Sequence, residues 1–192
     1  MFSGRFKMGK FPPYQYIGGD RRFSLTITIK TPEKWDMWNE CSSIFVENFK
    51  ILFKYGVYDA NKYLIRATPM LTGRLRGGWT SFLNAHNIDY SSAFMDVTMV
   101  WGHNEPLSPQ AINEGMMMSY YQESDFLVTL INAVPYVDYV EMGTSNMAGY
   151  NFASRTMYKG EFIIKKYIED WTSKCSEMGE IVKPEILDEV QV

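Results

Sequence analysis

The fold of this chain is decided by the stretch Val134-Pro-Tyr-Val-Asp-Tyr-Val-Glu-Met-Gly-Thr-Ser-Asn-Met-Ala-Gly-Tyr-Asn-Phe152. A strand-like run, residues 126–133, precedes it, and a long amphipathic pattern, residues 155–178, comes after it. Its apolar residues are expected to form a buried face: Tyr136, Val137, Tyr139, Val140 and Met142. Gly143 is expected to end this element through a left-handed conformation. Glu141 to Thr144 is therefore predicted to form a fixed corner between a sheet and a helix.

Composition indicates one folded domain. The chain has 192 residues, of which 46% are hydrophobic and 21% charged, enough apolar material for a packed core. The net charge of −3 gives no global basic field of the kind that binds nucleic acid. Cys41 and Cys175 fall among apolar residues and are expected to be buried free thiols. No signal peptide or membrane span is recognisable, so we expect a soluble protein made in the cytoplasm.

The chain divides into an arm, a domain and a tail. Residues 1–22 are basic and rich in Gly and Pro, which predicts an extended N-terminal arm. Residues 23–178 are predicted to form a single α+β domain, and residues 179–192 an acidic C-terminal tail. The arm and the tail carry opposite charges, which could pair between subunits.

Two long helices and a small sheet are expected within the domain. Thr31-Pro32-Glu33 predicts the start of the first helix, Gly56 is a possible break in it, and Pro69 ends it. The second helix covers residues 155–178. The sheet is expected to be an antiparallel meander whose strands follow Arg76 and cover 94–101 and 126–133, in addition to a half-buried strand at 23–30. Residues 104–121 are predicted to be an inserted loop, with a short helix near 109–117.

The fold class is therefore α+β: a small antiparallel sheet packed against a long N-terminal helix and a long C-terminal helix. The pattern of chemistry-bearing residues gives little sign of catalysis. His86 and His103 are far apart and are expected to be solvated loop residues. No Gly-x-Ser-x-Gly elbow, metal-ligand spacing or phosphate-binding glycine loop is present. We predict no catalytic residue, no metal and no cofactor, and hence a protein that is not an enzyme.

Arg74 and Arg76 are the most distinctive charged pair. In an extended chain, residues two apart point the same way, so these guanidinium groups could clamp one carboxylate, with Glu141 as a candidate. The alternative is a pair of exposed charges that contribute little. Contact with phosphate is a weaker hypothesis than either.

Two segments resemble the signatures of one family. Thr68-Pro-Met-Leu-Thr-Gly-Arg-Leu-Arg-Gly-Gly-Trp79 resembles the Pro-x-x-Thr-Gly-x-Leu-(Arg) signature of the neck proteins of tailed bacteriophages, which are also described as tail-completion proteins of the head–tail junction. Asn132-Ala-Val-Pro-Tyr-Val-Asp-Tyr-Val-Glu-Met-Gly-Thr144 resembles the second signature of this family, and Met147, Ala148 and Phe152 resemble the family's Met-Ala-x-x-x-Phe run downstream of it. The sequence departs from the family in having Val137 at a usually small position, and in its longer loops.

The resemblance implies a structural virion protein. Such a subunit would form a homo-oligomeric ring of about six or twelve copies between the portal or connector proteins (adaptor and head-closure proteins) and the tail terminator. DNA would pass through the lumen without sequence-specific binding, and no membrane would be involved. The residues expected to shape the subunit or its interfaces are Thr72, Gly73, Arg74, Leu75, Arg76, Tyr136, Tyr139, Glu141, Gly143, Thr144 and Phe152.

Three other functions remain open at this point. The protein could instead be the ring at the top of the tail, as a tail terminator or tail-completion protein. It could be a small-ligand or enzyme domain with Arg74, Arg76 and Glu141 around a pocket. It could also be an accessory DNA-binding module that uses the basic arm, residues 1–22, and its binding would then depend steeply on salt.

Overall fold

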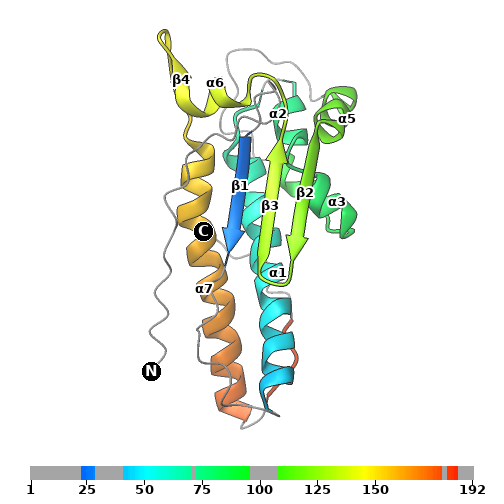
Figure 1. Ribbon diagram of the computed structural model, residues 1–192, viewed down its shortest axis with the longest axis vertical. Coiled ribbons are helices and arrows are strands. Elements are labelled where there is room, and N and C mark those ends of the chain that lie inside the picture. The colour runs from blue at the N-terminus through cyan, green and yellow to red at the C-terminus, as the bar shows by residue number, and fades with distance from the viewer. Residues whose placement is uncertain (1–22, 29–40, 71, 96–107, 179–180, 186–192) are drawn as a thin grey trace.

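A computed structural model describes residues 23–28, 41–70, 72–95, 108–178 and 181–185 of the chain (Figure 1). Its elements in chain order are β1 (Phe23–Thr28), α1 (Cys41–Ala67), α2 (Arg74–Gly77), α3 (Ser81–Ala85), α4 (Ser92–Met95), α5 (Pro109–Met117), β2 (Ser119–Ser124), β3 (Leu127–Asn132), α6 (Val137–Met142), β4 (Gly143–Thr144), β5 (Met147–Ala148) and α7 (Phe152–Met178). The predicted arm, the start of the first helix, His103, residues 96–101 and most of the acidic tail lie outside the described residues.

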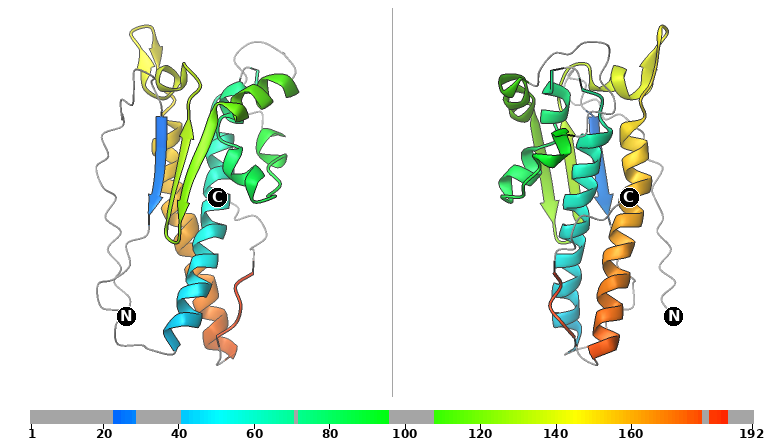
Figure 2. Two further views of the ribbon diagram at one scale, coloured as in Figure 1. Left: turned by 45° about the vertical axis from the view of Figure 1, so that its right-hand side comes forward. Right: turned by 180° about the vertical axis from the view of Figure 1, so that it is seen from behind.

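The α+β prediction is confirmed. The helices α1 and α7, 27 residues each, lie side by side and antiparallel, and the sheet lies beside them (Figures 1 and 2). The sheet is antiparallel with strand order β1-β3-β2, so β3 is central and pairs Leu130 with both Leu25 and Tyr121. Residues of α1 and α7 bury their apolar faces against each other and against β3.

The predicted break at Gly56 is wrong, because α1 runs through it without interruption. A Cβ atom at Gly56 would lie 2.6 Å from Ile164 Cγ1 and 3.2 Å from Ile164 Cα of α7. One turn further on, Gly160 of α7 lies against Ala60 of α1. The glycine costs about 1 kcal/mol of helix propensity, and the close approach of the two helices offsets that cost.

The closing helix was predicted correctly over most of its length. Ile164, Tyr167 and Trp171 are buried on one face, and the Tyr167 hydroxyl donates a hydrogen bond to Asp59 of α1 at 2.7 Å. The face does not stay buried to the end of the helix, because Met178 is exposed and Cys175 is only partly buried, contrary to the expected buried thiol. The side chain of Cys41 lies outside the described part of the chain.

The middle of the chain differs most from the prediction. Instead of a strand after Arg76, the chain forms the short helices α2 and α3, and Phe94 and Met95 of the next predicted strand belong to α4. The predicted short helix is confirmed as α5, where Ser108 accepts a hydrogen bond from Ala111 N and Pro109 is the first residue. The end of the predicted loop is strand β2, at the edge of the sheet. Its polar sequence, Ser-Tyr-Tyr-Gln-Glu-Ser, lacks the apolar alternation by which a strand is recognised.

Candidate functional site

The two family-like segments meet at one end of the subunit. Asn132, the last residue of β3, donates a hydrogen bond from Nδ2 to the carbonyl of Leu75 in α2 at 3.1 Å. Its Oδ1 accepts one from Val134 N at 3.0 Å. The Asn132 side chain is fully buried, so it joins the first segment to the second from inside the protein.

Arg76 is the most deeply placed charge at this end. Only 1% of its surface is exposed, and Leu75 beside it is also buried. Its Nε donates to the carbonyl of Thr68 at 2.7 Å and its Nη2 to that of Arg66 at 3.0 Å, while Nη1 lies 3.4 Å from the carbonyl of Ala93. The guanidinium therefore connects α2 to the C-terminal end of α1 and to the start of α4.

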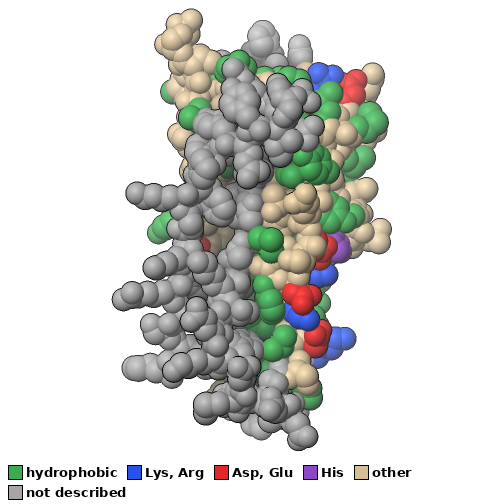
Figure 3. Space-filling model, viewed as in Figure 1, with side chains coloured by type: hydrophobic (Ala, Val, Ile, Leu, Met, Phe, Trp, Pro, Cys, Tyr) green, Lys and Arg blue, Asp and Glu red, His purple; other side chains and the backbone are tan. Residues whose placement is uncertain are grey.

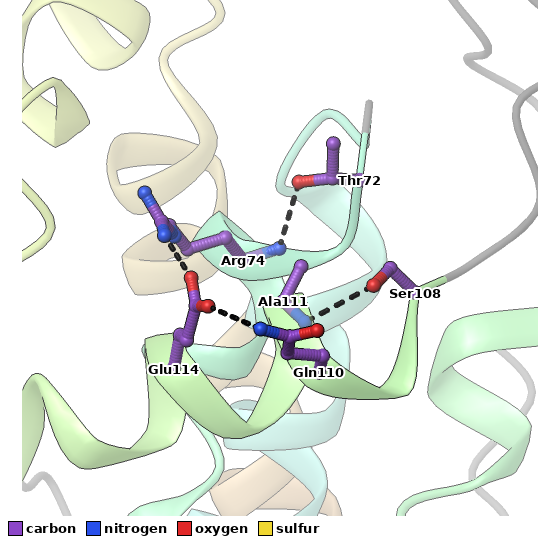
Figure 4. A network of polar contacts seen from close by, with 6 residues as sticks. All are labelled: Thr72, Arg74, Ser108, Gln110, Ala111 and Glu114. Atoms are coloured by element: carbon purple, nitrogen blue, oxygen red, sulfur yellow. Dashed lines mark hydrogen bonds and ion pairs between the residues drawn. The ribbon is translucent and has the colours of Figure 1, made fainter.

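Arg74 and Arg76 do not form the predicted clamp. Gly73 has φ of 94°, and the chain then turns into α2, where residues two apart differ by about 200° around the helix axis. Arg74 and Arg76 therefore lie on different sides of α2, and Arg74 pairs with Glu114 of α5 instead of Glu141. Figure 4 shows the pair of Arg74 and Glu114. The Thr72 hydroxyl accepts a long hydrogen bond from Arg74 N at 3.5 Å. Glu114 was missed by sequence reasoning, because nothing in the pattern indicates which side of α5 faces α2.

Two glycines bring the backbones of α2 and α5 into contact. A Cβ atom at Gly115 would lie 1.9 Å from the carbonyl oxygen of Arg74, and one at Gly77 would lie 2.2 Å from that of Ile112. Backbone atoms cannot move aside as the tip of a side chain can. The α2–α5 crossing therefore depends on the absence of a side chain at both positions.

Glu141 supports the predicted corner, though as a cap and not as the partner of an arginine. Only 4% of its surface is exposed. Its Oε2 accepts a hydrogen bond from Ala153 N at 3.1 Å, and its Oε1 one from Ser154 N at 3.4 Å. These amides are at the N-terminus of α7, where they have no partner within the helix and where a negative charge is favoured. The carboxylate of α6 thus fixes the start of α7.

The corner is closed by a small hairpin. Gly143 ends α6 as predicted, with φ of 85° and ψ of −177°, a region that is almost restricted to glycine. The positive φ agrees with the prediction, but the extended ψ differs from the left-handed helical conformation that was expected. Gly143 and Thr144 form β4, which pairs with β5. Phe152, at the start of α7, is buried with its ring centroid 6.2 Å from that of Trp79.

Replacing Glu141 by glutamine is expected to change how stability depends on pH. Burial raises the pKa of Glu141, and the hydrogen bonds from the α7 amides offset this only in part. A raised pKa means that the native state binds the proton more tightly, so the contribution of this group is largest at low pH and is lost as pH rises through the folded pKa. Urea unfolding from about pH 4 to about pH 7 should show the wild type losing stability relative to Glu141→Gln, by about 1.4 kcal/mol per unit by which the pKa is raised. A difference that does not vary with pH would contradict this.

The predicted buried face of α6 is only partly correct. Val137 is buried, but Tyr136, Tyr139 and Met142 are exposed. Because they are three residues apart, they follow one face of α6 and point outward from the corner.

His86 is not the solvated residue that was expected. Its Nε2 lies 2.9 Å from Oε2 of Glu123 in β2, and its ring packs edge-on against Phe82. Lys54 of α1 lies 2.7 Å from the other oxygen of the same carboxylate. Burial raises the pKa of Glu123, but the bonds to Lys54 and His86 outweigh it and hold that pKa below its usual value. This cluster joins α1, α3 and β2, and each of its polar groups is paired within it.

The chemistry available at the corner is structural. Arg76, Asn132 and Glu141 are each bonded to backbone groups of another segment, and they do not converge on a common pocket. Within the described part of the chain, no three acidic, His or Cys side chains are grouped so that they could hold a metal ion. None of the helices described here is both long enough and apolar enough to cross a membrane. Comparisons with protein-family models, with curated proteins and with solved structures found no match for this chain.

Proposed function

We propose that this chain is a structural virion protein that forms a ring at the head–tail junction of a tailed bacteriophage. In this role it joins the connector to the tail around the DNA channel. The observation that carries the proposal is the corner itself: both family-like segments fold onto one end of the subunit, and their buried polar side chains are bonded to the backbone of neighbouring segments.

Such an arrangement supports a scaffold more than a ligand site. A residue that binds or transforms a substrate must present its polar group to that substrate. Arg76 and Glu141, which a small-ligand hypothesis would place around a pocket, use their polar atoms to hold α1, α2 and α7 in place. Groups used in this way give a subunit a fixed shape, which is the requirement for a repeated contact in a ring.

The outer surface of the same end supports contact with other proteins. Large apolar side chains are exposed at the start of α6 and along it: Tyr136, Tyr139 and Met142. Met and Tyr are enriched at protein–protein interfaces, whereas a monomer rarely exposes a large apolar area without a use for it. We assign this end to contacts with the neighbouring portal-side proteins or the tail terminator.

The charge of the chain fits a channel through which DNA slides. Affinity for DNA grows with each phosphate that a protein neutralises, and a net charge of −3 provides no excess of cations for that. DNA would therefore pass through the lumen without being held.

Quantitative peptide mass spectrometry of purified particles tests the proposal. We expect this chain at a low, fixed copy number relative to the major capsid protein, as a single ring requires. Separate measurement of isolated heads and isolated tails would place the ring on one side of the junction, and recovery with tails alone would identify it as the ring at the top of the tail. Abundance in infected cells together with absence from particles would contradict the proposal.

A further inference from the structure

Positive charge is absent from a long central part of the sequence. No Lys or Arg occurs between Arg76 and Arg155, and all 19 of these residues lie in the remaining parts of the chain. The same central part contains eight acidic residues: Asp89, Asp96, Glu105, Glu114, Glu123, Asp125, Asp138 and Glu141. The surfaces of α3, α5, β2 and α6 consequently carry no cation of their own.

The exposed face of α7 has the opposite character. Tyr158 and Phe162, one turn apart, are 73% and 53% exposed, and Arg155, Lys159 and Lys166 lie around them in the same part of the helix. Glu161 and the exposed pair of Lys165 and Glu169 lie in the same turns, so cations outnumber carboxylates on this face by four to two. Among the described residues, no ion pair joins Arg155, Lys159 or Lys166 to a carboxylate, and Arg155 donates to the carbonyls of Tyr150 and Ala67. We call Arg155, Tyr158, Lys159, Phe162 and Lys166 the α7 stripe.

The α7 stripe faces away from the rest of the subunit. Gly160 and Ile164, which lie on the opposite side of the helix, pack against α1. Nothing among the described residues covers Tyr158 or Phe162. Aromatic side chains and Arg are enriched at protein–protein interfaces, where a polar rim commonly surrounds an apolar centre.

A surface of complementary character lies on the other side of the molecule. Met117, which is 76% exposed, and Met118 are at the junction of α5 and the edge strand β2, and Glu114, Glu123 and Asp125 lie along the same edge. Figures 1 and 2 show α5 and β2 on the side of the subunit opposite to α7. We call these five residues the α5–β2 edge.

Each carboxylate of the α5–β2 edge has a cation partner within the subunit but can accept further hydrogen bonds. Glu114 pairs with Arg74, Glu123 with Lys54, and Asp125 with Lys50. Figure 3 shows charged side chains of both signs gathered along this side of the molecule. The pairs are partly or largely exposed and therefore weak, and each carboxylate can accept several hydrogen bonds, so a further cation can join them.

We propose that the α7 stripe of one copy packs against the α5–β2 edge of the next copy. Tyr158 and Phe162 would contact Met117 and Met118, which favours sulfur–aromatic contacts, while the cations of the stripe would meet the acidic residues of the edge. The two surfaces differ and lie on opposite sides, so the contact is head-to-tail and propagates around a ring. This inference rests on the proposed ring function and identifies the contact between neighbouring subunits of the ring. We call this contact the seam.

The size of the apolar centre sets the conditions for a test. An aromatic side chain offers roughly 150–250 Å², so Tyr158 and Phe162 present on the order of 250 Å², about a third of the ~800 Å² that each partner buries in a standard interface. The seam is therefore weak in the free protein and forms at high concentration or on a neighbouring ring.

Zero-length carbodiimide cross-linking tests the seam in the full-length purified protein. An equal mixture of ordinary and ¹⁵N-labelled chains, at high concentration, should give links between chains that join Lys159 or Lys166 to Glu114, Glu123 or Asp125. The variant Met117→Asn removes the apolar contact without adding a charge or a carboxylate, and we expect its yield of these links to fall by roughly tenfold. Tyr158→Asn should have the same effect from the other side.

Met178→Asn is the matched control, because Met178 is 62% exposed and lies at the far end of α7. It should leave the yield unchanged, and circular dichroism should show all three variants folded. Links confined to other residues, no links between chains, or equal yields from Met117→Asn and Met178→Asn would overturn the seam. This outcome can be distinguished from that of the particle measurement. If the chain is present in particles but these links are not found, the proposed seam is wrong and the neck function stands. If the links are found but the chain is absent from particles, the seam stands and the neck function is wrong.

Discussion

Replacing Arg76 by leucine is expected to lower the free energy of unfolding by about 2–5 kcal/mol, because the hydrogen bonds of a charged donor are lost and their acceptors are left unsatisfied. The leucine fills much of the space but leaves the carbonyls of Thr68 and Arg66, which now accept hydrogen bonds at 2.7 and 3.0 Å, without these donors. Arg76→Lys should also be strongly destabilising, because the ammonium group of lysine cannot replace the planar set of N–H donors of the guanidinium. Urea unfolding followed by circular dichroism measures both effects.

Arg74 provides the matched control for this prediction. It is the same residue type two positions earlier, but it is partly exposed and its partner is the side chain of Glu114. Arg74→Leu should lower the free energy of unfolding by less than about 1 kcal/mol, as expected for the loss of an ion pair near the surface. Equal losses for the two arginines would show that the Arg76 network does not hold this end of the subunit together.

Replacing Gly115 by alanine is expected to destabilise the protein by about 3 kcal/mol, at the upper end of the cost of overpacking. Helix propensity alone predicts the opposite sign, since alanine in a helix is favoured over glycine by about 1 kcal/mol. The added methyl group would lie 1.9 Å from the carbonyl oxygen of Arg74, so α5 and α2 would have to separate. Thermal and urea unfolding both report the change.

Gly160→Ala serves as the control for the glycine contact. Its methyl group would lie 3.3 Å from the Cβ atom of Ala60, a tight contact that small shifts can relieve. We expect a change of no more than about 1 kcal/mol in either direction. A Gly115→Ala variant more stable than the wild type would contradict the close crossing of α2 and α5.

The parts of the fold that were predicted correctly are those with strong local signals. The closing helix has apolar residues at three–four spacing, and its buried residues Ile164, Tyr167 and Trp171 follow that spacing. The helix α5 begins with Ser108 and Pro109, which mark a helix start independently of the rest of the fold. The turn at Gly143 follows from the special backbone conformation that only glycine adopts easily.

The parts that were predicted wrongly depend on contacts between distant segments. Trp79, Ser81 and Leu83 alternate as in a strand, yet this region forms α2 and α3 because of contacts with other segments. Arg76 donates to the carbonyl of Thr68, Asn132 donates to that of Leu75, and α5 crosses α2 at Gly77 and Gly115. Whether Gly56 breaks a helix or lets another helix approach is decided by Ile164 of α7. Neither distinction is encoded in the local sequence pattern.

The predicted site was right in place and wrong in detail. Glu141 and Gly143 do shape the corner, but the partner of Glu141 is the N-terminus of α7, and the partner of Arg74 is Glu114. Tyr136 and Tyr139 count as apolar in a sequence pattern, although amphipathic side chains of this kind also occur at surfaces. Sequence periodicity cannot distinguish a face that packs within one chain from a face that packs against another.

Particles assembled without this chain provide the most direct test of its role. In the virus that the proposal implies, silencing the gene should leave DNA-filled heads and finished tails that do not join, and supplying the protein afterwards should restore joined particles in electron micrographs. Whole, infectious particles formed in its absence would contradict a role at the head–tail junction.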